Sequence, residues 1–132
     1  MELILAIDDD KHILKILEQQ ISKMGYKVIT AKSGADGVSF AQTGNPDLVI
    51  LDIMMPEMDG HSVMKKLRRD QITKNIPVIM LTSSSKKQDV QEAMRYGAVD
   101  YIVKPHNHKV LENKIASAIK YRKDSDITEQ NT

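Results

Sequence analysis

Short apolar segments alternate with segments of helical periodicity along most of the chain. The apolar segments have the length of strands and cover residues 3–7, 27–30, 48–51, 77–81 and 99–103. After each of them, apolar residues recur every three or four positions. This spacing predicts helices over residues 13–24, 33–43, 59–69, 85–96 and 107–121.

The order of these segments predicts the fold class. Apolar strands that alternate with amphipathic helices indicate a parallel sheet covered on both faces. A closed barrel of such units needs about eight strands, whereas the pattern contains five. The prediction is therefore an α/β domain with a five-stranded, parallel, doubly wound sheet and five helices.

The pattern changes after Tyr121, where the sequence becomes polar as far as Thr132. We interpret residues 1–121 as one domain and residues 122–132 as a polar tail or the beginning of a linker. The sequence contains no internal repeat and no low-complexity segment.

Composition narrows the class of protein further. The chain has 132 residues, of which 41% are hydrophobic and 28% charged, as is ordinary for a globular domain. Its net charge of +1 gives no electrostatic reason for direct binding to nucleic acid or to an acidic membrane surface. It has no cysteine, and none of its apolar segments approaches the roughly 20 residues of a membrane span. We therefore expect a cytoplasmic protein without disulfides or thiolate metal sites.

Polar residues follow four of the five predicted strands. Residues 8–10 are all aspartates, Asp52 follows the third strand, Thr82 the fourth, and Lys104 ends the fifth. The carboxyl ends of parallel strands lie at one edge of a sheet, where open α/β folds bind ligands. We therefore expect these side chains to lie close together.

A cluster of carboxylates at one edge requires a counter-charge. Two like charges about 4 Å apart repel by roughly 4 kcal/mol at an effective dielectric constant near 20. Oxygen ligands without histidine or cysteine favour a hard divalent cation, Mg²⁺ first. A lysine and a hydroxyl group at the same edge add donors for an anion, so the set as a whole suits phosphoryl chemistry.

Each of these residues also has an ordinary structural interpretation. Asp10 is well placed to cap the first helix, and Thr82 could cap the helix that follows it. Asp52 alone would be a turn residue, and Lys104 alone would be solvated. The occurrence of such residues at four strand ends is what favours a shared site.

The chain resembles the receiver domains of two-component response regulators over about residues 2–121. The matching segments occur in the order and at the spacing typical of that family. They are Ile7-Asp8-Asp9, Asp52 with Met55-Pro56 and Met58-Asp59-Gly60, Thr82-Ser83, Gly97-Ala98, and Tyr101-Ile102-Val103-Lys104-Pro105. The resemblance implies a flavodoxin-like sheet with the strand order 2-1-3-4-5.

The resemblance also implies a phosphoacceptor and a metal site. Asp52 would accept a phosphoryl group from a sensor histidine kinase or a histidine phosphotransfer protein. Asp9 and Asp52 would bind Mg²⁺ directly, Asp8 mainly through water, and the backbone carbonyl of Met54 would be the remaining protein ligand. Mn²⁺ could replace Mg²⁺.

The remaining implied residues would couple phosphorylation to a change in surface. Lys104 would pair with Asp52 and then with the phosphoryl oxygens, and its peptide bond to Pro105 would be cis. Thr82 would shift toward the phosphoryl group while Tyr101 changes rotamer. The surface around the fourth helix, fifth strand and fifth helix would then engage a downstream effector or a fused output domain.

Two positions depart from the commonest family pattern. His106 follows the Lys104-Pro105 pair where an apolar residue is usual. The last helix is therefore not assumed to dock or dimerise in the way familiar from the family. Met54, two residues after the acceptor, cannot orient a hydrolytic water. We therefore expect a long-lived acyl phosphate. The domain would catalyse its own phosphorylation and slow dephosphorylation, as a signalling domain rather than an enzyme.

Two other classes of protein use some of the same features. A Mg²⁺-dependent phosphatase with Asp52 as nucleophile is the main alternative, but it usually needs a second acid as general acid. Ile53 and Met54 supply none, and the loops are too short to form a lid. A flavin-binding protein of similar fold would need a phosphate-binding loop after the first strand, where the three aspartates would repel the flavin phosphate.

Overall fold

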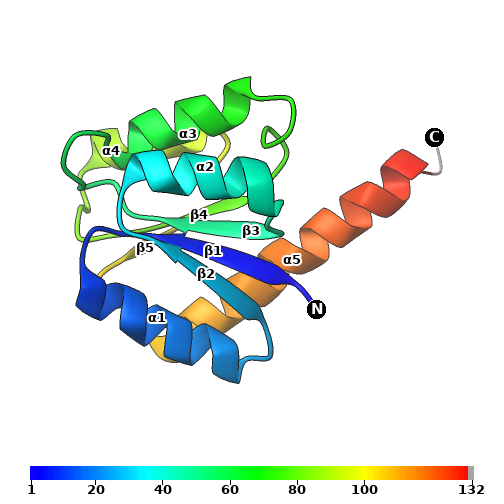
Figure 1. Cartoon of the computed structure of the whole chain (residues 1–132), viewed down its shortest axis with the longest axis horizontal. Coiled ribbons are helices and arrows are strands. Elements are labelled where there is room, and N and C mark those ends of the chain that lie inside the picture. Colours follow the sequence, from blue (N-terminus) through cyan, green and yellow to red (C-terminus); the bar gives the residue numbers. More distant parts are fainter. Residues whose placement is uncertain (131–132) are drawn as a thin grey trace.

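The computed structural model describes residues 1–130, and the side chains of residues 1–122. Strands and helices alternate throughout (Figure 1). The strands are β1 (Leu3–Ile7), β2 (Lys27–Ala31), β3 (Leu48–Leu51), β4 (Val78–Thr82) and β5 (Asp100–Val103). The helices are α1 (Lys11–Lys23), α2 (Gly34–Gly44), α3 (Gly60–Arg69), α4 (Lys87–Arg95) and α5 (His108–Gln130).

All five strands are parallel and form one sheet in the order β2-β1-β3-β4-β5. Ile7 at the end of β1 lies opposite Leu51 at the end of β3, and Thr82 lies opposite Val103. The carboxyl ends of the strands therefore lie at one edge. The predicted fold class and the strand order implied by the resemblance are both confirmed.

The sheet divides the core into two apolar layers, as expected for strands buried on both faces. Helices α2, α3 and α4 cover one face and α1 and α5 the other (Figure 1). Successive residues of β1 point to opposite layers: Leu5 and Ile7 toward the first, Ile4 and Ala6 toward the second. Because the strands are packed on both faces, the edge formed by their carboxyl ends has a rigid support.

Helix caps follow the sequence signals. Asp10 accepts hydrogen bonds from the His12 and Ile13 amides at the start of α1 and is the N-cap, as its position suggested. Ser33 caps α2 in the same way. Gly25 follows α1 with a φ of 97°, a conformation that glycine adopts at little cost.

The helices lie within about two residues of their predicted bounds, except at the end of α5. Helix α4 begins at Lys87 rather than Ser85, because residues 83–86 form a loop in which the Lys86 amide donates to the Ser84 hydroxyl. Helix α5 continues past Tyr121 to Gln130, through a segment without proline or glycine to end it. The division at residue 121 into domain and tail stays a prediction, and residues 131–132 lie outside the described part. No helix within residues 1–130 is long and apolar enough to cross a bilayer.

Candidate functional site

Asp8 and Asp52 lie side by side because the strands before them are paired. The Asp52 amide donates to the carbonyl oxygen of Ile7 over 3.0 Å, which continues the pairing of β1 and β3 by one residue. Asp8 is 2% exposed and Asp52 5%, whereas Asp9 is exposed. One oxygen from each carboxylate lies within 4.8 Å of the other two. Three of the predicted site residues therefore converge.

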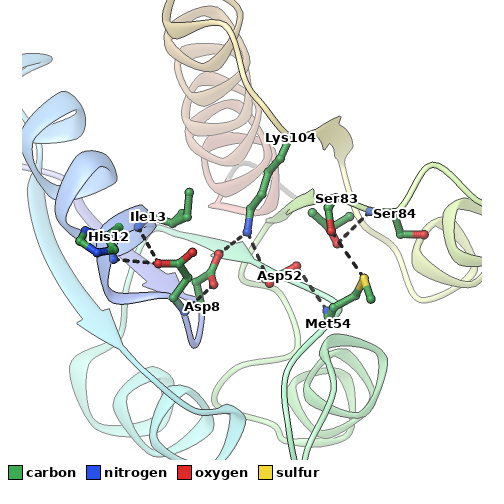
Figure 2. A network of polar contacts seen from close by, with 10 residues as sticks. Asp8, His12, Ile13, Asp52, Met54, Ser83, Ser84 and Lys104 are labelled. Carbon is green, nitrogen blue, oxygen red and sulfur yellow. Dashed lines mark hydrogen bonds and ion pairs between the residues drawn. The ribbon is translucent and has the colours of Figure 1, made fainter.

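Lys104 reaches this cluster from the end of β5 (Figure 2). Its Nζ lies 2.6 Å from Asp8 Oδ2 and 3.5 Å from Asp52 Oδ2. The lysine thus contacts both carboxylates, and Asp8 is the nearer partner, although the resemblance pointed first to Asp52. The Lys104-Pro105 peptide bond is cis, as expected.

Burial and charge shift the titration of this group of residues. Burial raises the pKa of Asp8 above its usual value, and the nearby Asp52 carboxylate adds to the rise, although Lys104 and the Asp10 amide oppose it. Burial alone would lower the pKa of Lys104, but the contacts with Asp8 and Asp52 outweigh it and the pKa is raised. Lys104 therefore stays charged at neutral pH, and its one positive charge is shared by two buried carboxylates.

The donor set fits a divalent metal ion. It consists of carboxylate oxygens from Asp8, Asp9 and Asp52, the ligand type preferred by hard cations. Asp9 is exposed, so solvent can complete the coordination of an ion at this edge. A cation here would also relieve the repulsion between Asp8 and Asp52.

Thr82 and Tyr101 lie on the neighbouring strands β4 and β5 and are linked through Ser84. Thr82 is fully buried, and its hydroxyl oxygen accepts a hydrogen bond from the Ser84 amide at 3.4 Å. The Tyr101 hydroxyl donates to the Ser84 carbonyl at 2.8 Å. Burial raises the pKa of Tyr101, which keeps the hydroxyl protonated. Both predicted switch residues therefore contact the loop after β4.

Met54 forms the wall of the site on the side of the loop after β3. Its side chain is 60% exposed, its amide lies 3.3 Å from Asp52 Oδ1, and its sulfur accepts a hydrogen bond from the Ser83 hydroxyl (Figure 2). Gly60 closes the same loop, since its amide donates to the carbonyl of Ile53. The role of the Met54 carbonyl as a metal ligand stays a prediction.

The sequence pattern did not single out three residues next to this site. His61 on α3, Asp89 on α4 and Ser84 in the loop after β4 are joined by hydrogen bonds. His61 is far from the other two in the sequence and none of the three belongs to a motif, so only the packing of α3 against α4 reveals the contact.

Comparison with known proteins identifies the family. Residues 4–116 match the family model of the response regulator receiver domain. The chain belongs to this family. As a receiver domain of a response regulator, it is a signalling domain of the two-component class.

Curated relatives of this receiver domain are described as transcriptional regulators. A probable transcriptional regulator, ycf27, of Porphyridium aerugineum is 43% identical over 90% of this chain and 48% of the relative. The transcriptional regulatory protein AfsQ1 of Streptomyces coelicolor is 38% identical over 91% of this chain and 52% of the relative. The chain therefore spans about half the length of the curated relatives that it matches.

Solved structures show the same fold. The chemotaxis protein CheY4 of Vibrio cholerae is 31% identical, with a TM-score of 0.85, and the match covers 89% of this chain and 98% of CheY4. A CheY-like receiver domain from Methanospirillum hungatei JF-1 is 26% identical, with a TM-score of 0.90, over 95% of this chain and 98% of that one. These neighbours share the flavodoxin-like order of strands found here.

Proposed function

We propose that Asp52 is the phosphoacceptor of this receiver domain and that the domain catalyses its own phosphorylation from a phosphohistidine donor. The observation that carries the proposal is the contact of Lys104 with both Asp8 and Asp52 beside the exposed Asp9. If Asp52 served only to form an ion pair with Lys104, the nearby carboxylates of Asp8 and Asp9 would not be needed.

The proposed reaction is an in-line phosphoryl transfer. An Asp52 carboxylate oxygen attacks phosphorus, the bond from phosphorus to the histidine nitrogen breaks, and the electron pair leaves with that nitrogen. Mg²⁺ bound by Asp9 and Asp52, with Asp8 acting through water, would neutralise charge on the phosphoryl oxygens. Lys104 would supply a further positive charge, and the Thr82 hydroxyl would donate a hydrogen bond.

The proposed donor is a sensor histidine kinase or a histidine phosphotransfer protein, in the cytoplasm. The proposed output surface comprises α4, β5 and α5. Met94 on α4, Val103 on β5 and Val110 on α5 are 48%, 42% and 40% exposed, respectively. Exposed apolar side chains on three neighbouring elements suit a protein contact, with either an effector protein or a fused output domain.

Phosphorylation by a small-molecule donor tests the proposal directly. The protein is incubated with Mg²⁺ and acetyl phosphate, and the intact mass is measured before and after treatment with base. We expect one acid-stable, base-labile phosphoryl group, which is absent from Asp52→Asn and retained by Asp36→Asn, a change at an exposed aspartate of α2. An adduct that persists in Asp52→Asn would contradict the proposal, and multiple-turnover release of phosphate from unrelated esters would favour the phosphatase.

A further inference from the structure

A series of hydrogen bonds through His61, Asp89 and Ser84, here called the relay, connects helix α3 with the loop after β4. His61 on α3 contacts Asp89 Oδ1 on α4 through Nε2, at 3.1 Å. The second oxygen of Asp89 accepts a hydrogen bond from the Ser84 hydroxyl. The Ser84 backbone contacts both Thr82 and Tyr101, as described above.

The side chains of His61 and Asp89, which lie farthest from Thr82 in the relay, are largely buried. The side chains of His61 and Asp89 are 15% and 25% exposed. The Nδ1 atom of His61 is buried and has no hydrogen-bond partner, so the only polar contact of the ring in the described structure is made through Nε2. Hydrogen bonds from Ser84 and then from His61 lower the pKa of Asp89, which keeps it an acceptor at neutral pH.

We infer that His61 and Asp89 are positioning residues for the phosphorylation of Asp52, acting through Ser84 on Thr82. Neither residue is assigned a contact with the phosphoryl group. Asp89 fixes the Ser84 side chain, and Ser84 in turn directs its amide at the Thr82 oxygen. That oxygen is then used as an acceptor, which leaves its own proton available for donation to a phosphoryl oxygen. This inference rests on the proposed function.

Preorganisation gives the direction of the expected effect. A donor that is already oriented loses little freedom when the charged group forms beside it. Without the contact to Asp89, residues 83–86 would sample other positions, and the Thr82 hydroxyl would have to be oriented at the moment of binding. Removal of the relay should therefore weaken the binding of a phosphoryl group without changing the metal site.

The experiment measures the affinity for beryllofluoride, a mimic of a phosphoryl group on a carboxylate, at saturating Mg²⁺ by NMR titration. We expect Asp89→Ala and His61→Ala to weaken this affinity about three- to tenfold, the range expected for one lost hydrogen bond. Asp89→Asn keeps an acceptor for Ser84 and should restore most of the affinity. Mg²⁺ affinity without beryllofluoride should stay as in the unmodified protein.

Glu92→Ala is the matched control. Glu92 also joins α4 to α3, through a 3.8 Å ion pair with Lys65, but no hydrogen bond or ion pair in the described structure joins its side chain to the loop. We expect this variant to bind beryllofluoride as the unmodified protein does. An equal loss in Glu92→Ala would mean that helix packing, rather than the relay, is responsible, and would overturn the inference.

A double-mutant cycle tests whether the effect passes through Ser84. In a Ser84→Ala background, Asp89→Ala should have no further effect. An undiminished loss in that background, or unchanged affinity in both single variants, would overturn the inference while leaving the proposed function intact. Failure of the unmodified protein to bind beryllofluoride at all would instead overturn the proposed function, and the inference with it.

Discussion

Met54 is the residue on which the expected lifetime of the acyl phosphate depends. Its side chain is exposed beside Asp52 and ends in a thioether that already accepts a hydrogen bond from Ser83. A thioether is a weak acceptor and has no proton to donate, so it can do little to orient a water molecule for attack on phosphorus.

The prediction is that Met54→Asn dephosphorylates faster than the unmodified protein. An amide at this position can hold the attacking water, and we expect roughly a tenfold increase, equivalent to about 1.4 kcal/mol of barrier. Loss of the phosphoryl group is followed by intact mass after the donor is removed. Met54→Leu, which keeps an apolar side chain, should lose its phosphoryl group at the rate of the unmodified protein. Faster dephosphorylation of the unmodified protein than of Met54→Asn would contradict the prediction.

Asp8 gives the site a second measurable property, which is a dependence of metal affinity on pH. Its pKa lies above the usual 3.8 because the carboxyl group is buried. A proton and the metal therefore compete at Asp8 at a higher pH than at an ordinary aspartate. The apparent Mg²⁺ affinity should be constant well above the Asp8 pKa and should fall as the pH is lowered through it.

Calorimetric Mg²⁺ titrations between neutral pH and about pH 4 would measure this dependence. In Asp8→Asn this decline should be absent over the pH range in which Asp8 takes up its proton in the unmodified protein. A decline at the same pH in both proteins would show that Asp8 is not the group responsible.

At the scale of elements, the turn between β3 and α3 depends on one glycine. A Cβ atom at Gly60 would lie 2.7 Å from the Ile53 Cα atom and still closer to the Asp52 carbonyl oxygen. Both neighbours are backbone atoms that cannot move away without disturbing the end of β3. The start of α3 can thus approach the strand that carries Asp52 only because residue 60 lacks a side chain.

We therefore predict that Gly60→Ala lowers the free energy of unfolding by about 1–3 kcal/mol, as overpacking commonly does. Gly44→Ala is the matched control, because a Cβ there would meet only Ile29 Cδ1 at 3.6 Å, an ordinary contact. Urea denaturation of both variants measures the difference. Equal stabilities for the two variants would refute the steric argument.

The elements were predictable to different degrees. The strands and α1 to α3 followed from apolar spacing and cap residues such as Asp10 and Ser33, because those signals are local. The start of α4 was misplaced because the Ser84 hydroxyl is directed at Asp89 and the Lys86 amide, a choice made by tertiary contacts. Val110 belonged to the expected apolar face of the last helix, yet it is 40% exposed, since periodicity alone does not show which apolar positions of a helix are covered.

The sequence predicts which residues lie at the site, but not which of them contact one another. The sequence placed Asp8, Asp52 and Lys104 at one edge, because parallel strands bring their carboxyl ends together. It could not show that Lys104 lies nearer to Asp8 than to Asp52, which depends on side-chain rotamers. Nor could it show His61 and Asp89 in contact, which depends on how α3 packs against α4.

At the scale of the whole molecule, the site draws its charged groups from the ends of three strands. Asp8 and Asp9 follow β1, Asp52 follows β3, and Lys104 follows β5. The cluster therefore exists only when the sheet is complete, and the unfolded chain cannot bring these carboxylates together. A ligand that binds this cluster must stabilise the folded state as a whole.

Mg²⁺ should accordingly raise the free energy of unfolding by about 2.7 kcal/mol when its concentration is a hundred times the dissociation constant. Thermal unfolding with and without MgCl₂ measures the effect, with NaCl at equal ionic strength as the control for screening. The stabilisation should shrink in Asp9→Asn and in Asp52→Asn, each of which loses one of the proposed carboxylate ligands, and persist in Asp36→Asn. If NaCl stabilises as much as MgCl₂ does, or if the two ligand variants respond as the unmodified protein does, the carboxylates are not acting as a specific metal site.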